Sequence, residues 1–341
     1  AIDRRTWAAL GLRPDARARV TSTFSPLPVE IELANVSPET LNGWSAYPLG
    51  IAWSLGENGV DLNAQRGFDV HIESNVPVGA GLSSSAAIEC AVAVALEESW
   101  QLGIDRLTLA RVGQLAENRA VGAPTGIMDQ SASLLGRRDS AVFLDCRSLH
   151  AEVVDLGFVA AGLEIVVIDT KVSHAHAQAT GGYAARRASC EAGAVALGVD
   201  SLRDVCVGDL DRARVVMDDE TFRRVRHIVT ENARVLATVR VLRESGPLAI
   251  GALLDESHAS MRDDFEISVP ELDLAVVAAR EAGAIGARMT GGGFGGAAIA
   301  LTPSALIPAL VAHVTAAFAA EGYAIPAIFT VIPSDGAKRD I

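Results

Sequence analysis

The sequence predicts an α+β protein of two domains, residues 1–155 and 156–341. Its 341 residues exceed what a single hydrophobic core usually organises, and half of them are apolar. Stretches with the period of strands and stretches with the period of helices also mix along the whole chain. We place the boundary between residues 146 and 163, where one predicted strand has ended and the next has not begun.

The predicted elements follow from apolar spacing. Apolar and polar residues alternate over Phe68–Ser74, which indicates a strand with one buried face. Residues 140–146 and Leu163–Thr170 are shorter, more apolar strand candidates. Three longer stretches have helical spacing and composition: residues 86–100, 183–198 and 222–246. The arginine clusters "RRASCE" and "RRVRH" in the last two are predicted to lie on solvated helix faces.

One apolar stretch is long enough to cross a membrane, since no charged residue occurs from Ala297 to Ala320. Pro303, Pro308 and the polar cluster "TPS" divide it. Beyond Pro308, four apolar residues fall on one helical face: Leu310, Val311, Val314 and Phe318. We therefore expect a strand, a turn and an amphipathic helix, and no membrane partner.

Charge and cysteine content narrow the class of protein. A net charge of −13 argues against a nucleic-acid partner, although backbone N–H groups and a metal ion can still bind a small anion. The four cysteines are far apart in sequence and form no CxxC pair. They indicate reduced, mostly buried thiols in a cytoplasmic protein.

The stretch "VPVGAGLSSSAAIECAVAVAL", residues 76–96, joins a predicted strand to a predicted helix. Gly79 and Gly81 allow a sharp turn, and Ser83, Ser84 and Ser85 stand where a helix begins. Free N–H groups and the helix dipole make such a start a phosphate site, and a serine oxygen can also bind Mg²⁺. A serine-capped junction without a ligand is the alternative.

Two further motifs need interpretation. "GGGFGG", Gly291–Gly296, matches GxGxxG but leads into a predicted strand, so it is not a dinucleotide fingerprint. It indicates close approach of the backbone to a ligand or to another loop. Asp129 lies between apolar "GIM" and polar "QSAS", which suits either a helix cap or a working carboxylate. His174 and His176 are interpreted as loop histidines.

Three stretches together resemble the galactokinase branch of the GHMP small-molecule kinases. "PVGAGLSSSAA" is similar to the phosphate-binding motif of that superfamily, and "ARMTGGGFGGAAIAL" to its C-terminal glycine motif. "GIMDQ", "SHASMRDDFEISVPELD" and "RHIVTEN" narrow the resemblance to galactokinases. It implies a two-domain GHMP-kinase fold with the active site in the cleft between the domains. It also implies ATP-dependent phosphorylation of the C1 hydroxyl group of galactose.

The resemblance assigns roles to individual residues. Asp129 corresponds to the catalytic aspartate, as a base or an orienting group, and Gly126 and Tyr183 to sugar contacts. Ser85 and Glu117 correspond to the residues associated with Mg²⁺. The loop around the ATP phosphates corresponds to Gly79, Ala80, Gly81, Leu82, Ser83, Ser84 and Ser85. The implied ligands are therefore ATP, Mg²⁺ and galactose, and we expect a monomer.

The chain departs from the family pattern in two places. The signature G-R-V-N-L-I-G-E-H-T-D-Y-N-G-G, which contributes sugar contacts in galactokinases, does not occur, and we expect the native protein to be longer. Thr125 stands where many relatives have cysteine, and we expect little effect. Two alternatives stay open: a kinase for N-acetylgalactosamine, arabinose or a uronic acid, and a galactose and ATP sensor without activity.

Overall fold

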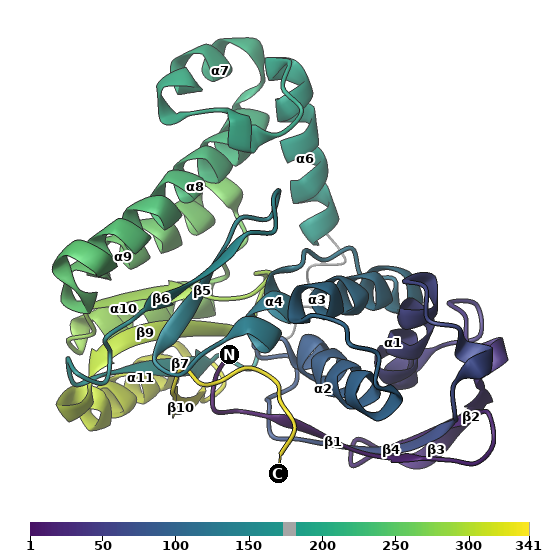
Figure 1. Cartoon of the computed structure of the whole chain (residues 1–341). Helices are drawn as coiled ribbons and strands as arrows, with labels where there is room; N and C mark the ends of the chain where they lie inside the picture. Colours follow the sequence, from purple (N-terminus) through teal and green to yellow (C-terminus); the bar gives the residue numbers. More distant parts are fainter. Residues whose placement is uncertain (173–181, 341) are drawn as a thin grey trace. The chain divides into compact units, whose positions relative to one another are not determined.

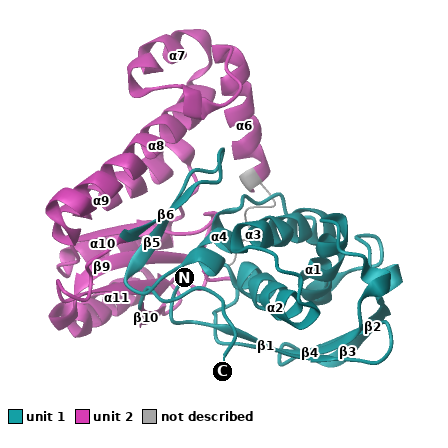
Figure 2. Cartoon of the chain, viewed as in Figure 1, with its two compact units in different colours: residues 1–78, 83–154, 332–341 teal, residues 79–82, 155–331 magenta. Residues whose placement is uncertain are grey.

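The computed structural model describes residues 1–172 and 182–340, and Figure 1 shows the order of their helices and strands. The chain forms two compact units, coloured separately in Figure 2. Unit 1 comprises Ala1–Val78, Ser83–Val154 and Ile332–Ile341, and unit 2 comprises Gly79–Leu82 and Asp155–Val331. Helices and sheets occur in both units, which confirms the α+β class. The domain division at residue 155 stays a prediction.

A four-stranded sheet forms one side of unit 1, with the strand order β1-β4-β2-β3. Strand β4 pairs antiparallel with β1 and parallel with β2, and β2 pairs antiparallel with β3. The predicted alternation in β4 is confirmed, since Phe68, Val70 and Ile72 are buried and the residues between them are exposed. The strands are β1 (Thr6–Leu12), β2 (Arg17–Ser22), β3 (Ser25–Glu32) and β4 (Phe68–Ser74).

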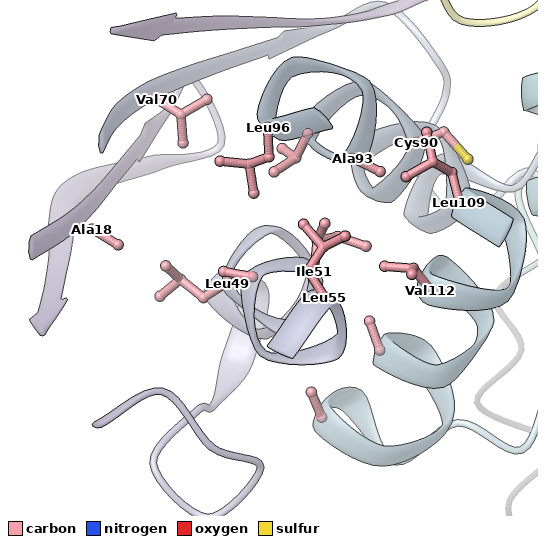
Figure 3. Close-up of a cluster of buried hydrophobic side chains, with 14 of the residues drawn as sticks. Ala18, Leu49, Ile51, Leu55, Val70, Cys90, Ala93, Leu96, Leu109 and Val112 are labelled. Carbon is pink, nitrogen blue, oxygen red and sulfur yellow. The ribbon is translucent and has the colours of Figure 1, made fainter. Parts of the chain in front are cut away.

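The helices of unit 1 gather on one face of this sheet (Figure 1). Apolar side chains of α1 and α2 meet those of the sheet and of α3 in the core shown in Figure 3. A π-helix, Ala116–Val121, directly continues α3, and a two-stranded sheet of β5 (Ser140–Leu144) and β6 (Ala151–Asp155) completes the unit. The helices are α1 (Ala46–Glu57), α2 (Ser84–Trp100), α3 (Arg106–Leu115) and α4 (Met128–Leu135).

Unit 2 contains an antiparallel sheet of order β10-β7-β9-β8. Its strands are β7 (Leu163–Asp169), β8 (Gly286–Met289), β9 (Ala297–Pro303) and β10 (Ala327–Val331). A π-helix, Met261–Phe265, follows α9. The α-helices are α6 (Gly182–Leu197), α7 (Leu210–Val216), α8 (Asp219–Ser245), α9 (Gly251–Ser260), α10 (Pro270–Glu281) and α11 (Ile307–Glu321).

The long apolar stretch forms strand β9, a short turn and helix α11, as predicted. By length and composition alone, Ser304–Glu321 could cross a membrane. Leu310, Val314 and Phe318 are nevertheless fully buried in the core of unit 2. Their spacing of four residues places them on one face, so α11 packs as an amphipathic core helix.

Two expectations from composition were wrong. Arg224 in "RRVRH" is only 1% exposed, because its guanidinium group donates to the Asp264 carbonyl and to the Glu266 carboxylate inside unit 2. All four cysteines are free, but only Cys90 is buried, whereas Cys146 and Cys206 are exposed. Neither correction concerns the periodicity of the elements, since both depend on where neighbouring segments pack.

Candidate active site

Helix α2 begins in a turn of left-handed backbone conformations. Gly79 and Gly81 have φ angles of 79° and 69°, and Ser83, at the N-cap, has 56°. Such an angle is uncommon outside glycine and typically costs on the order of 1–3 kcal/mol, so strain at Ser83 indicates a functional constraint. The first N–H groups of α2 have no partner within the helix, and its dipole is positive here. An anion can therefore bind at this helix start.

Ser83 holds the carboxylate of Asp129. Its Oγ donates to Asp129 Oδ2 over 2.6 Å, within unit 1. Asp129 is the second residue of α4 and is half-buried, while Ile127 occupies the N-cap position without a side-chain bond. Asp129 therefore does not cap its helix, and its role as a working carboxylate stays a prediction.

The second carboxylate, Glu117, lies in the π-helix that follows α3. Ser85 Oγ donates to its Oε1 over 2.8 Å, and Thr125 Oγ1 donates to its Oε2 over 2.8 Å. Gly50 lets α1 pack closely here, since a Cβ atom at this position would lie 2.9 Å from that of Ala120. A π-turn inserted in a helix often marks a functional site, and this one carries Glu117.

A third acid, Glu89 of α2, is fully buried next to these two. Gln130 connects it to Glu117, because its Nε2 donates to Glu89 Oε2 over 2.9 Å and to Glu117 Oε2 over 2.8 Å. The donors that bind the three carboxyl groups are hydroxyl and amide groups, which carry no charge. The cluster is therefore held by neutral hydrogen bonds.

Burial raises the pKa of two of these acids, Glu89 and Asp129. Desolvation, followed by the charge of Glu117, raises the pKa of Glu89 to about 9, so Glu89 is neutral near pH 7. Desolvation also raises the pKa of Asp129, and the Ser83 hydrogen bond opposes this by stabilising the charged form. A carboxylate with a raised pKa is a better proton acceptor, which suits Asp129 to general-base chemistry.

The second glycine motif packs backbone against backbone within unit 2. A Cβ atom on Gly291, whose φ is 80°, would lie 3.1 Å from Gly81 Cα. A Cβ atom on Gly81 would lie 3.1 Å from the Thr290 carbonyl oxygen. The expectation of a close approach between this motif and another loop is thus confirmed, and the other loop is Gly79–Leu82.

The rest of this motif is fixed from two sides. A Cβ atom on Gly293 would lie 2.5 Å from the Ile267 carbonyl oxygen, which also accepts the Phe294 N–H over 2.7 Å. On the other side, the Gly296 N–H donates to the Val172 carbonyl over 3.0 Å. The loop then continues into strand β9, which confirms that it does not open a helix. This motif thus contacts Gly79–Leu82 on one side, through Thr290 and Gly291, and the backbone at Ile267 and Val172 on others.

The remaining candidates differ in how much the structure says of them. Gly126 is exposed, and a Cβ atom there would meet nothing within 4 Å. Ala80 is buried and Leu82 half-buried. Tyr183 is in the first turn of α6, but its side chain is outside the described residues, as are His174 and His176. The site geometry therefore depends on the serines and acids.

Sequence reasoning missed three members of the cluster: Glu89, Thr125 and Gln130. One signal was available, because Glu89 is an acid within the apolar run "AAIECAVAVAL". Such an acid must be neutralised, paired or hydrogen-bonded when the helix is buried. For Thr125, where little effect was expected, the hydrogen bond to Glu117 gives a direct contact with the cluster.

Ser85 and Glu117 form the donor set that best suits a divalent cation. A hydroxyl and a carboxylate are hard oxygen ligands, and Mg²⁺ commonly takes one or two protein carboxylates together with phosphate oxygens. Among the described residues, no group of three or more His, Cys, Asp or Glu could hold a metal ion. The pair therefore fits a cation that arrives with a phosphate ligand, and not a cage built from the protein alone.

Comparison with known proteins decides the family. Residues 46–137 match the GHMP kinases N terminal domain, and residues 238–320 match the GHMP kinases C terminal domain. A galactokinase of Streptomyces coelicolor is 47% identical over 99% of this chain and 87% of its own length. The chain belongs to the galactokinase family of GHMP kinases.

Other members support the same family. A galactokinase of Mycobacterium tuberculosis is 42% identical over 89% of this chain and 83% of its own length. The crystal structure of Lactococcus lactis galactokinase in complex with galactose has a TM-score of 0.91 at 31% identity, covering 98% of this chain and 87% of that one. Methanococcus jannaschii mevalonate kinase, with a TM-score of 0.66 at 17% identity, shares the fold over 98% of this chain and 90% of its own.

The raised pKa of Glu89 predicts a pH-dependent stability difference. The pKa of Glu89 is 4.5 in the unfolded chain and about 9 in the folded protein. At a pH between these two values, Glu89 is protonated in the folded state and ionised in the unfolded state. Stability from this group is therefore complete below pH 4.5 and is lost as pH rises toward 9. Glu89→Gln cannot titrate, so its stability relative to the wild type should increase across this window, by at most about 1.4 kcal/mol per pH unit.

Urea denaturation of both proteins at pH 5, 7 and 9 measures this difference. Glu97→Gln, on the same helix and half-buried, is the matched control and should show a constant difference. A constant difference for Glu89→Gln as well would show that Glu89 is ionised in the folded protein.

Proposed function

We propose that this protein transfers the γ-phosphoryl group of ATP to the C1 hydroxyl group of galactose and forms galactose 1-phosphate. Relatives named galactokinase at 42–47% identity support this activity, as does the similarity to a galactokinase in complex with galactose. Within the chain, the observation that carries the proposal is the Ser83–Asp129 hydrogen bond at the start of helix α2. It joins the phosphate-binding motif to the acid that the family uses in catalysis.

Asp129 is assigned to the sugar hydroxyl group. Ser83 occupies Oδ2, and we assign Oδ1 to the proton of the C1 hydroxyl. The proton moves to Asp129 as the sugar oxygen bonds to phosphorus and the bond to the ADP oxygen breaks. Burial keeps the pKa of Asp129 above its ordinary value, which favours this transfer.

The start of helix α2 is assigned to the nucleotide. Its free N–H groups and the loop Gly79–Leu82 bind the phosphates, with Ser84 among the contacts. Ser85 and Glu117 would hold Mg²⁺, which would offset the negative charge of the phosphate oxygens. Gly126, whose surroundings are open, and Tyr183 contact the sugar. Phosphoryl transfer needs mainly such positioning and charge stabilisation.

The two alternatives from the sequence are not favoured, because the curated relatives at 42–47% identity are named galactokinases. Neither another sugar nor a sensor without activity has an observation in its support. We further propose that the protein acts as a cytoplasmic monomer. Its GHMP domains would be residues 1–155 and 156–341.

Galactose-dependent release of ADP tests the activity. Asp129→Asn should lower kcat by on the order of 10²–10⁴-fold, because the base is lost while shape is kept. Glu97→Gln, a distant acid in the same unit, should retain the wild-type rate. A loss below about tenfold in Asp129→Asn would remove its role as base. Absence of galactose-dependent turnover in the wild type would reject the proposed function.

The Ser83 hydrogen bond predicts a pH effect. It lowers the pKa of Asp129 by favouring the carboxylate, so Ser83→Ala should raise that pKa. Because the base works when ionised, the acid limb of kcat/KM for Mg·ATP should move to higher pH. A pH–rate profile measures the shift, with Ser84→Ala as the neighbouring control. An unmoved limb in Ser83→Ala would show that this bond does not tune Asp129.

The contact between the two glycine motifs predicts that a substitution in the second motif weakens the use of Mg·ATP. Gly291→Ala places a methyl group against Gly81 and strains a left-handed backbone, so it displaces the phosphate loop. KM for Mg·ATP should rise about tenfold, while KM for galactose stays within about twofold. Gly292→Ala is the matched control, because its Cβ atom meets nothing within 4 Å. Steady-state kinetics measure both constants. An equal KM for Mg·ATP in the two variants would contradict the proposal.

A further inference from the structure

Glu89 is a buried acid to which the proposed reaction gives no role. It is fully buried in helix α2, and its Oε1 has no hydrogen-bond partner among the described residues. An unpaired polar atom of this kind destabilises a fold, because it has lost its hydrogen bonds to water. An apolar residue would pack in this helix without that loss, so the carboxyl group is better explained by what it contacts.

Glu89 is connected to Glu117 by hydrogen bonds from the side chain of Gln130. The amide nitrogen of Gln130 donates to Glu89 Oε2 and to Glu117 Oε2, so a single NH₂ group joins the two acids. Gln130 is fully buried, and its own Oε1 has no hydrogen-bond partner within residues 1–172 and 182–340. Both N–H groups of this side chain are therefore used on the two acids, and its orientation is fixed by them.

The surrounding helices make room for this connection. A Cβ atom on Gly113 of α3 would lie 2.9 Å from Gln130 Cγ and 3.7 Å from Glu89 Oε2. Any larger residue at position 113 would displace the Gln130 side chain. On α2, Glu89 follows Ser85 by four residues, so both lie on one face of the helix. That face reaches Glu117 twice, directly from Ser85 and through Gln130 from Glu89.

The hydrogen bonds divide the two oxygens of Glu117. Its Oε2 accepts from Thr125 and Gln130, and its Oε1 accepts from Ser85. A carboxylate held at both oxygens from three segments cannot rotate freely. Oε1 is thereby kept beside the Ser85 hydroxyl.

We propose that Glu89 is a positioning residue, which through Gln130 fixes the carboxylate of Glu117 beside Ser85 for binding of Mg·nucleotide. This rests on the proposed function only in assigning Mg²⁺ to Ser85 and Glu117. Residues that orient metal ligands in this way commonly change metal affinity by 10–100-fold when mutated.

Isothermal titration calorimetry of nucleotide binding, with no galactose present, tests this positioning role. The wild type is titrated with AMPPNP in the presence of Mg²⁺ and in EDTA, and the ratio of the two affinities is the readout. Glu89→Ala should reduce this ratio on the order of 10-fold and leave affinity in EDTA within about twofold. Glu89→Gln keeps the shape and the acceptor for Gln130, and should retain the ratio within about threefold. Glu97→Ala, on the same helix, should match the wild type.

A second variant guards against misfolding of Glu89→Ala. Gln130→Met has similar size but lacks both N–H groups, and should reduce the same ratio. The double variant should be no weaker than the weaker single one, since both act through one connection. Circular dichroism and thermal melting establish that each variant is folded.

Three results would overturn the proposal. The first is an unchanged ratio in folded Glu89→Ala and Gln130→Met, and the second is an equal loss in Glu89→Gln and Glu89→Ala. The third is a wild type whose nucleotide affinity does not depend on Mg²⁺. A wild type that binds Mg·AMPPNP but does not phosphorylate galactose would reject the proposed function while leaving this test intact.

Discussion

Burial of three carboxyl groups side by side is the constraint on which the site depends. Glu89, Glu117 and Asp129 repel one another when charged, and burial removes the water that would stabilise each charge. Hydroxyl and amide donors solve part of this problem, since Ser83 binds Asp129 and Ser85 binds Glu117. Neutralisation of Glu89 solves the rest, because its pKa rises to about 9. The start of helix α2 and two of the acids are thus joined by direct hydrogen bonds.

A second constraint is contact between backbones. Gly81 and Gly291 approach so closely that a side chain on either would force the two loops apart. Gly293 and Gly295 meet the backbone at Ile267 and Val172 in the same way. The glycines therefore serve packing as much as flexibility, and they give Gly79–Leu82 a fixed support within unit 2.

The sequence allowed the elements to be predicted better than their contacts. Strand β4 and helix α8 followed from periodicity, because one buried face leaves a repeating pattern. Helix α2 followed from its alanine content and nearly continuous apolar run. Asp129 and the Ser85–Glu117 pair followed from a family resemblance. The Gln130 bridge could not be predicted, since its partners are 13 and 41 residues away and meet only after α2, α4 and the π-helix have packed. The burial of Arg224 likewise depends on the segment that contains Asp264 and Glu266.

A neutral Glu89 also limits the charge that the site presents to a nucleotide. With Glu89 protonated, the cluster carries one negative charge fewer than three ionised acids would, which weakens repulsion of a polyanionic ligand. The proposed chemistry assigns a proton to Asp129 and a cation to Glu117. Glu89 is tolerated as a third acid because it accepts a hydrogen bond from Gln130 without adding a negative charge. An apolar residue would remove the acceptor, and lysine or arginine could only donate and so could not accept from Gln130. Among side chains of this length, only a carboxylic acid or an amide meets both requirements.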